Sequence, residues 1–414
     1  MILPRAGRGV WVVGVALLLF AVAGMVCSTL DSVKFQTEAD EGFYLAYASR
    51  VAIEGPAGFP GLFTAYLNSL EAARYFPNPL RILTISLGAA ALKLGGGSYF
   101  TNLALLSLAA FLGMLVLMFV GTGRAFGWRT AAWTLLLACA APLHLALARR
   151  ALSDTLISFF LMASLWLFLR AIWKEEGGKA PPLRWLWVML SFAAALLVKE
   201  SGFLLVPTAL FFLGWRWLRT RRPLPLWPVL AVSALPLALA GSVMVLAAGG
   251  IHPVLKTAAG FAGAAHVNTY ALHYQNGPWF RFLIDLLLLS PWPVICWLGW
   301  IGVLVADRSR DERVWFWALV PVLFIAMLCW VPAGKNARFI LFLEMPMRLC
   351  TVLLLERLAG ARKGGGVRSA ILVGGVVLLI VVQDLDSFFR LFVTGGIYDP
   401  VSFSLLSARG FLPP

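Results

Sequence analysis

Three carboxylates lie within four residues in the segment Glu38-Ala39-Asp40-Glu41-Gly42, which closely follows the first apolar run of the chain. The chain has 34 Lys and Arg residues against 19 Asp and Glu residues, so an acidic cluster beside an apolar run needs a reason. Ionisable groups at such a boundary usually pair with a charge or take part in chemistry. We predict that Asp40 and Glu41 belong to a catalytic site. The alternative is a helix start at which acidic side chains complement the helix dipole.

Cations at the ends of other apolar runs could bind the anion that such chemistry needs. Lys199 and Glu200 interrupt the otherwise apolar stretch 185–217. A bare hairpin turn favours Asn, Asp, Gly and Ser, so this lysine indicates an anion; snorkelling of Lys199 or pairing with Glu200 is the alternative. Lys335 and Arg338 would share one face of a helix start and could bind a phosphate together. A topology signal or a lipid-headgroup contact would explain this pair equally well.

Two further groups complete the predicted site. Between two apolar runs lie Arg149, Arg150 and Asp154, and Asp154 is either a second catalytic acid or part of a helix cap. The loop 249–279 holds aromatic and histidine side chains that could stack on a sugar, although an aromatic belt at the membrane interface is the default interpretation. From this loop we select three candidate substrate contacts: His266, Tyr270 and His273.

Acids and cations around one external cleft indicate glycosyl transfer from a lipid-phosphate donor. Asp40 would take the proton from an acceptor hydroxyl as it attacks the anomeric carbon. Lys199, Lys335 and Arg338 would neutralise the departing polyprenyl phosphate. Attack opposite the leaving group would invert the anomeric centre. No cofactor or metal is expected, because fixed cations can stabilise the phosphate and the four histidines include no HExxH pair.

The composition places these residues in a membrane protein. Hydrophobic residues make up 61% of the 414 residues, charged residues make up 13%, and the mean hydropathy is +0.86. Such a chain must use lipid as its solvent, so we predict an all-α polytopic membrane protein. The net charge of +15 resides in short Lys and Arg clusters between apolar runs, which is typical of topology signals and excludes nucleic acid as a partner. The five cysteines are odd in number and show no CxxC spacing, so we interpret them as core residues.

We predict a bundle of about eleven transmembrane helices in the inner (plasma) membrane, with a cytoplasmic N-terminus and an external site. The expected spans are Val10–Leu30, Phe100–Val120, Ala131–Ala148, Thr155–Ile172, Trp185–Val198, Phe203–Trp217, Leu226–Ala248, Phe282–Val305, Val314–Pro332, Phe339–Leu355 and Ser369–Gln383.

A long first external loop, residues 31–99, should carry two interfacial helices, at Glu41–Glu54 and Leu80–Leu94. The second is too short for the ~20 apolar residues that a span needs. With this topology each basic cluster falls in the cytoplasm, and the other ionic residues at span ends gather on the external face. We divide the chain into a transmembrane catalytic module, 1–355, and a C-terminal span with a short external tail, 356–414.

The motifs resemble those of the GT-C superfamily of polyprenyl-phosphate-sugar glycosyltransferases, in particular protein O-mannosyltransferases and lipid A aminoarabinose transferases. The similar segments are 39–44, 149–154, 198–202 and 335–339 followed by Pro346. The resemblance implies that Asp40 is the catalytic acid of the first external loop, Asp154 the acid of the second loop, and Lys199 and Arg338 donor-phosphate contacts. The implied partners are a polyprenyl-phosphate hexose or pentose, membrane lipids, and a lipid, glycan or protein acceptor. The chain departs from the lipid A branch at residues 76–80, where that branch carries a Lys-Pro-Pro-Leu-like turn.

Two other functions compete with this interpretation. A lipid-linked-sugar flippase or other transporter should place ionisable sites near the membrane midplane, whereas here we expect the charges at span ends. An O-antigen polymerase or ligase normally has its large external loop late in the chain, and here the long loop comes first.

Overall fold

The computed structural model describes residues 5–69, 77–173, 182–221, 226–264, 267–330, 334–360 and 366–412, and every structural statement below refers to these ranges. All the regular elements within them are helices, as predicted for an all-α membrane protein.

The first elements are α1 (Arg5–Ser28), η1 (Leu30–Ser32), α2 (Asp40–Glu54), η2 (Gly55–Ala57), α3 (Gly58–Asn68) and α5 (Ile82–Leu94). Next come α6 (Tyr99–Phe126), α7 (Trp128–Cys139), α8 (Pro142–Leu147), α9 (Asp154–Trp173), α10 (Pro182–Val198), η4 (Glu200–Leu204) and α11 (Leu205–Thr220). The middle of the chain forms α12 (Leu226–Val232), α13 (Ala234–Ala248), α14 (Ile251–Ala264), α15 (Thr269–Tyr274), α16 (Arg281–Leu289), α17 (Pro291–Ala306) and α18 (Glu312–Cys329). The last elements are η5 (Ala337–Leu343), α19 (Glu344–Leu358), α20 (Val367–Phe388), the π-helix η7 (Phe389–Thr394) and α21 (Ser402–Ala408).

Seven helical stretches within the described ranges are long and apolar enough to cross a membrane: Val12–Ser32, Tyr99–Phe126, Asp154–Trp173, Glu200–Thr220, Leu226–Ala248, Glu312–Cys329 and Val367–Thr394. Shorter apolar helices are Ile82–Leu94, Leu183–Val198 and Pro291–Ala306. A polytopic membrane protein is therefore confirmed, but the predicted number of about eleven spans is not.

Four of the predicted spans are not single α-helices. The expected span Leu226–Ala248 consists of α12 and α13, and the expected span Phe339–Leu355 consists of the 3-10 helix η5 and α19. The other two divide at a proline. The expected span Ala131–Ala148 divides into α7 and α8, and the expected span Phe282–Val305 divides into α16 and α17. Pro142 and Pro291 begin the second helix of each pair. A proline inside a helix lacks the N–H group for the ladder and its ring clashes with the preceding turn, whereas at the first helical position it fits well.

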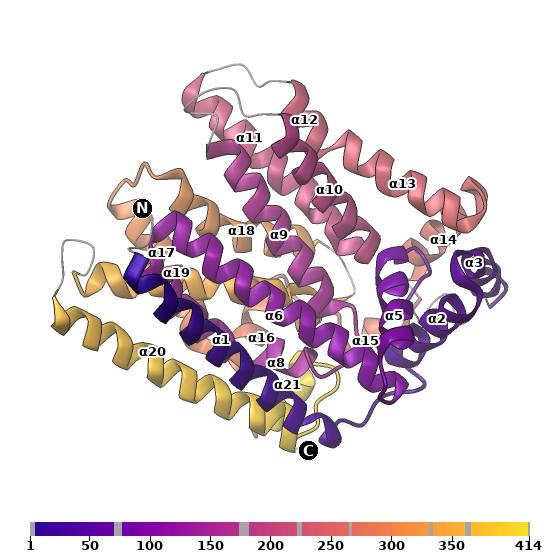
Figure 1. The fold of residues 1–414 in the computed structure, drawn as a ribbon, viewed down its shortest axis with the longest axis horizontal. Helices are drawn as coiled ribbons and strands as arrows, with labels where there is room; N and C mark the ends of the chain where they lie inside the picture. Colours follow the sequence, from indigo (N-terminus) through magenta and orange to yellow (C-terminus); the bar gives the residue numbers. More distant parts are fainter. Residues whose placement is uncertain are drawn as a thin grey trace.

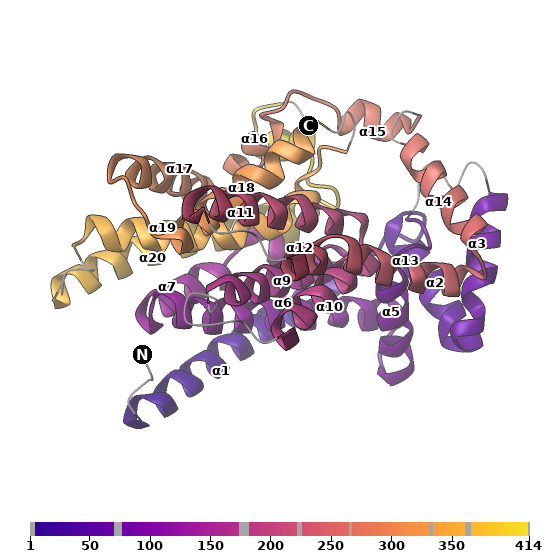
Figure 2. The same cartoon turned by 90° about the horizontal axis from the view of Figure 1, so that it is seen from above.

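The long helices α1, α6 and α20 run in roughly the same direction, and α5 runs across that direction (Figures 1 and 2). Helices α2, α3 and α5 gather at one end of the molecule, and the N-terminus lies at the opposite end (Figures 1 and 2). The two helices predicted for the first loop are present as α2 and α5. An orientation of α5 across the bundle agrees with a helix that lies along a membrane surface.

Candidate active site

Asp40 and Arg338 meet although 298 positions separate them in the chain. One Asp40 carboxylate oxygen lies 3.4 Å from Nη2 of Arg338. The Asp40 side chain is 31% exposed and that of Arg338 only 9%. Asp40 occupies the first turn of α2, so the helix-start interpretation of this acid also holds. The start of α2 and η5 thus lie in contact, with a partly exposed carboxylate beside a buried guanidinium.

Two glycines explain how the charged motifs reach their positions. A Cβ atom on Gly42 would lie 1.8 Å from the carbonyl oxygen of Thr37, so only glycine lets α2 begin against this loop. A Cβ atom on Gly202 would lie 2.5 Å from the carbonyl of Ala195, so the chain folds back on the end of α10 at this residue. Gly42 and Gly202 thus allow the close backbone contacts that position the neighbouring residues Asp40 and Lys199.

Lys199 pairs with Asp154, with its Nζ atom 2.5 Å from a carboxylate oxygen, and both side chains are buried. The alternative in which Lys199 pairs with Glu200 is wrong. The ammonium group also lies 4.8 Å from the ring centroid of Phe339. Burial lowers the pKa of Lys199, and the negative charge of Asp154 opposes this shift. Asp154 thus holds the Lys199 cation next to Phe339 of η5.

Glu200 instead forms an ion pair with Arg81, 2.8 Å away, and accepts a hydrogen bond from the Asn78 amide at 2.6 Å. Arg81 also donates a hydrogen bond to the hydroxyl of Tyr44. Sequence reasoning treated Arg81 only as the end of a surface helix and missed its place in the site. The available signal was an arginine directly after the Pro-Asn-Pro-Leu turn, at the position where the chain departs from the lipid A branch.

The C-terminal tail supplies an acid that sequence reasoning did not select. Asp399 lies 3.3 Å from Nε of Arg338. Its carboxylate also accepts hydrogen bonds from the Tyr270 hydroxyl at 2.5 Å, from the Gln275 amide at 3.3 Å and from the Asn336 amide. Tyr270, a predicted substrate contact, therefore joins the site through Asp399. Residues on both sides of the predicted 355/356 boundary share this cluster.

Three of the predicted site residues form contacts that connect separate segments of the chain near the site: Glu41, Arg149 and Arg150. The buried Glu41 carboxylate accepts backbone hydrogen bonds from Gln36 at 2.8 Å and Ala151 at 3.0 Å and pairs with Arg150 at 3.3 Å. Burial raises the pKa of Glu41, and Arg150 opposes the shift. Arg149 donates two hydrogen bonds at 2.6 Å, one to the carbonyl of Thr29 and one to the hydroxyl of Ser32. These contacts connect the first loop, residues 31–99, to the segment that precedes α9.

The remaining predicted residues lie in different places. Lys335 is buried, and its backbone N–H donates to the carbonyl of Gln275 at 2.8 Å. His273 packs edge-on against Tyr274, with ring centroids 4.8 Å apart on α15. His266 lies outside the residues that the structure describes. Within the described ranges, no group of three or more His, Cys, Asp and Glu side chains is arranged to hold a metal ion.

A second ionic network is buried inside the bundle, away from the cluster around Arg338. Nη2 of Arg348 lies 2.6 Å from the Asp384 carboxylate, and Nη1 lies 3.7 Å from that of Glu344. Glu344 also contacts Nδ1 of His144 at 2.8 Å, and the Ser290 hydroxyl donates to Asp384 at 2.6 Å. Asp384 lies within the apolar span Val367–Thr394. The expectation that charges occur only at span ends is therefore wrong.

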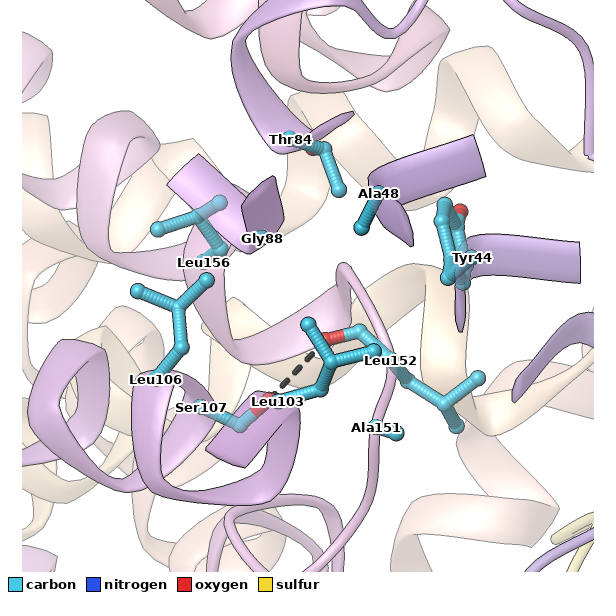
Figure 3. A pocket seen from close by; sticks show the side chains of 10 residues that line it. All are labelled: Tyr44, Ala48, Thr84, Gly88, Leu103, Leu106, Ser107, Ala151, Leu152 and Leu156. Carbon is cyan, nitrogen blue, oxygen red and sulfur yellow. Dashed lines mark hydrogen bonds between the residues drawn. The ribbon is translucent and has the colours of Figure 1, made fainter. Parts of the chain in front are cut away.

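An apolar cavity adjoins the charged cluster at Tyr44 (Figure 3). It is small, with a volume of about 20 Å³, and lies between α2, α5, α6 and the segment that leads into α9. Its lining residues are Tyr44, Ala48, Thr84, Gly88, Leu103, Leu106, Ser107, Ala151, Leu152 and Leu156. The Tyr44 hydroxyl also lies 2.8 Å from that of Ser153, so one side chain borders both the apolar space and the polar site.

Comparison with known proteins supports the resemblance read from the motifs. The profile of the dolichyl-phosphate-mannose-protein mannosyltransferase family matches residues 85–246. The structure of ArnT from Cupriavidus metallidurans bound to undecaprenyl phosphate is 17% identical, with a TM-score of 0.54 over 97% of this chain and 75% of that chain. The chain has a GT-C fold. The predicted GT-C resemblance is thereby confirmed.

Solved structures of archaeal proteins also match this chain. The Archaeoglobus fulgidus oligosaccharyltransferase tethered to an acceptor peptide is 14% identical, with a TM-score of 0.60 over 93% of this chain and 55% of that chain. AglB from Archaeoglobus fulgidus in complex with an inhibitory peptide and a dolichol-phosphate is 12% identical, with a TM-score of 0.51 over 82% of this chain and 52% of that chain. The chain thus spans about half the length of these archaeal proteins. A comparison with curated protein sequences gives no match.

Proposed function

We propose that this protein is a membrane glycosyltransferase that moves a sugar from a polyprenyl-phosphate donor to an acceptor hydroxyl. The observation that carries the proposal is the partly exposed Asp40 carboxylate, 3.4 Å from the buried guanidinium of Arg338. Asp40 can accept the proton of the acceptor hydroxyl, and Arg338 can bind the anionic phosphate of the donor. The pair therefore provides the two functions that a glycosyl transfer needs.

The comparisons support the same donor class. The related ArnT structure holds undecaprenyl phosphate, and the related AglB structure holds dolichol-phosphate. The site opens on the external face of the inner membrane in this proposal, which keeps the basic clusters between the spans in the cytoplasm.

In the proposed reaction, Asp40 accepts the proton of the acceptor hydroxyl while its oxygen forms a bond to the anomeric carbon. The bond from that carbon to the phosphate oxygen breaks, and the leaving polyprenyl phosphate keeps the electron pair. Arg338 and Lys199 stabilise the added charge, because cations fixed in a site of low dielectric cost no reorganisation during the reaction. Attack from the opposite side inverts the anomeric centre. Asp154 positions Lys199 through their ion pair. Glu41 takes no part in the proposed reaction.

The direct test is to incubate purified protein with labelled polyprenyl-phosphate sugars and a membrane extract, and to identify what becomes labelled. A labelled lipid, glycan or protein acceptor is the expected product. Donor binding without any product, even when a range of acceptors is supplied, would favour a transporter instead.

Replacing Arg338 with alanine should weaken donor binding by about tenfold to a hundredfold, because a charge-assisted contact to phosphate is lost. The choice of acceptor should change little, since the guanidinium faces the donor in the proposed site. The measurement is the KM for the donor together with the ratio of rates for two acceptors. A changed acceptor ratio with an unchanged donor KM would contradict the assignment.

The pH dependence of transfer should reflect Lys199. Burial lowers the pKa of this lysine, so the ammonium should lose its proton at a lower pH than an exposed lysine does. Activity should therefore fall on the alkaline side as this charge disappears. In the Lys199→Arg variant the guanidinium stays charged, so the alkaline limb should move to higher pH. An alkaline limb that Lys199→Arg leaves in place would assign it to another group.

A further inference from the structure

The C-terminal segment 397–402 lies directly against the residues around Arg338. The backbone N–H of Ala337 donates to the carbonyl of Pro400 at 3.3 Å, and the Asp399 carboxylate lies 3.3 Å from Nε of Arg338. The Ser402 hydroxyl accepts a hydrogen bond from Nε of Arg281 at 2.8 Å. Contacts at both ends of the segment fix its path across the site.

Tyr398 on this segment lies between two arginines of the site. The guanidinium carbon of Arg150 is 4.9 Å from the Tyr398 ring centroid, and that of Arg338 is 5.7 Å from it. The Tyr398 hydroxyl oxygen is buried and has no hydrogen-bond partner among the described residues. Burial raises the pKa of this hydroxyl; Arg338 opposes the shift, and the carboxylates of Asp40 and Glu41 add to it. The hydroxyl is therefore in the charged cluster itself.

A second donor in the same cluster also lacks a partner. Nη1 of Arg338 is buried without a hydrogen bond in the described part of the chain, whereas Nη2 contacts Asp40. A buried donor without an acceptor costs about 1–3 kcal/mol, so such groups are usually satisfied by a ligand or water. The Arg338 guanidinium carbon lies 5.7 Å from the Tyr398 ring centroid, so one ligand with more than one acceptor oxygen would match both the O–H group and the N–H group. A phosphate monoester or diester has this property.

We propose that the C-terminal tail completes the donor-phosphate site, with the Tyr398 hydroxyl donating a hydrogen bond to the phosphate of the polyprenyl lipid. Nη1 of Arg338 donates to the same phosphate. The positive charge of Arg338, whose Nε atom lies 3.3 Å from the Asp399 carboxylate, offsets the repulsion between Asp399 and the phosphate. This inference rests on the proposed function and adds to it a ligand residue from the predicted C-terminal tail.

The test is to measure the affinity of purified Tyr398→Phe protein for undecaprenyl phosphate by the change in tryptophan fluorescence on binding. The substitution keeps the ring under both arginines and removes only the hydroxyl. We expect binding to weaken about tenfold, as for a hydrogen bond to a charged group, while the melting temperature stays unchanged because the hydroxyl has no protein partner to lose. Binding of undecaprenol, which lacks the phosphate, should be the same in both proteins.

Tyr99→Phe is the matched control, because Tyr99 is an exposed tyrosine at the start of α6 and is 65% accessible. It should bind undecaprenyl phosphate like the wild type. The proposal is overturned if Tyr398→Phe also binds within about twofold of wild type, if undecaprenol binding falls equally, or if the melting temperature drops with the affinity. Failure of the wild-type protein to bind undecaprenyl phosphate would overturn the proposed function as well, so the two failures are distinguishable.

Discussion

Sugar transfer by the Asp40→Asn variant should be about 10²- to 10⁴-fold slower than by the wild type, the range that a general base contributes. Asparagine has almost the same shape as aspartate but cannot accept the proton of the acceptor hydroxyl. Asp40 is the partly exposed carboxylate of the pair with Arg338, so an acceptor can reach it. The loss should appear in kcat, measured with labelled donor at saturation, while the affinity for undecaprenyl phosphate is retained.

Glu38→Gln is the matched control, because Glu38 is an exposed acid two positions away in the same acidic segment. Its turnover should stay within about twofold of wild type, as is usual for a surface side chain without partners in the reaction. Near-normal turnover of Asp40→Asn would remove the proposed base. Equal damage from both substitutions would instead indicate that the net charge of the loop matters and not one carboxylate.

The parts of the site that were predictable from sequence are those where charge interrupts an apolar run. The acidic segment around Asp40, the Lys199-Glu200 pair and the Lys335/Arg338 pair are conspicuous because lipid-facing sequence seldom contains ions. Most helices were predictable for the same reason, since long apolar runs have few alternatives in a membrane. The breaks at Pro142 and Pro291 were missed because hydropathy alone does not register a lost backbone donor.

The rest depended on contacts between residues far apart in the chain. Arg81 could have paired with any nearby acid, and only packing brings it to Glu200, 119 positions away. Asp399 and Tyr398 lie after the last predicted span, where no cluster of charges and no long apolar run draws attention to them. The network of His144, Glu344, Arg348 and Asp384 joins three separate helices, α8, α19 and α20, and only Glu344 and Arg348 are close to each other in sequence. Tertiary contacts of this kind leave no periodic or compositional signal.

The buried network leads to the largest expected change in stability. In the Arg348→Met variant the carboxylates of Asp384 and Glu344 lose their shared guanidinium, which lies 2.6 Å from one and 3.7 Å from the other. Both acids are almost completely buried, so neither can be solvated in place. Breaking a buried pair by removing one partner typically costs about 3–5 kcal/mol. We expect a loss of this size in the free energy of unfolding in detergent, measured by chemical denaturation.

Arg357→Met on the same helix, α19, is the matched control for this change. Arg357 pairs with Asp307 at 2.9 Å, but both side chains are more than 40% exposed, so the substitution should cost less than about 1 kcal/mol. If the stranded charge is the cause of the loss, adding Asp384→Asn to Arg348→Met should restore part of the stability, because one of the two unpaired carboxylates becomes neutral. Further destabilisation of the double variant would show that the loss comes from packing around the methionine and not from buried charge.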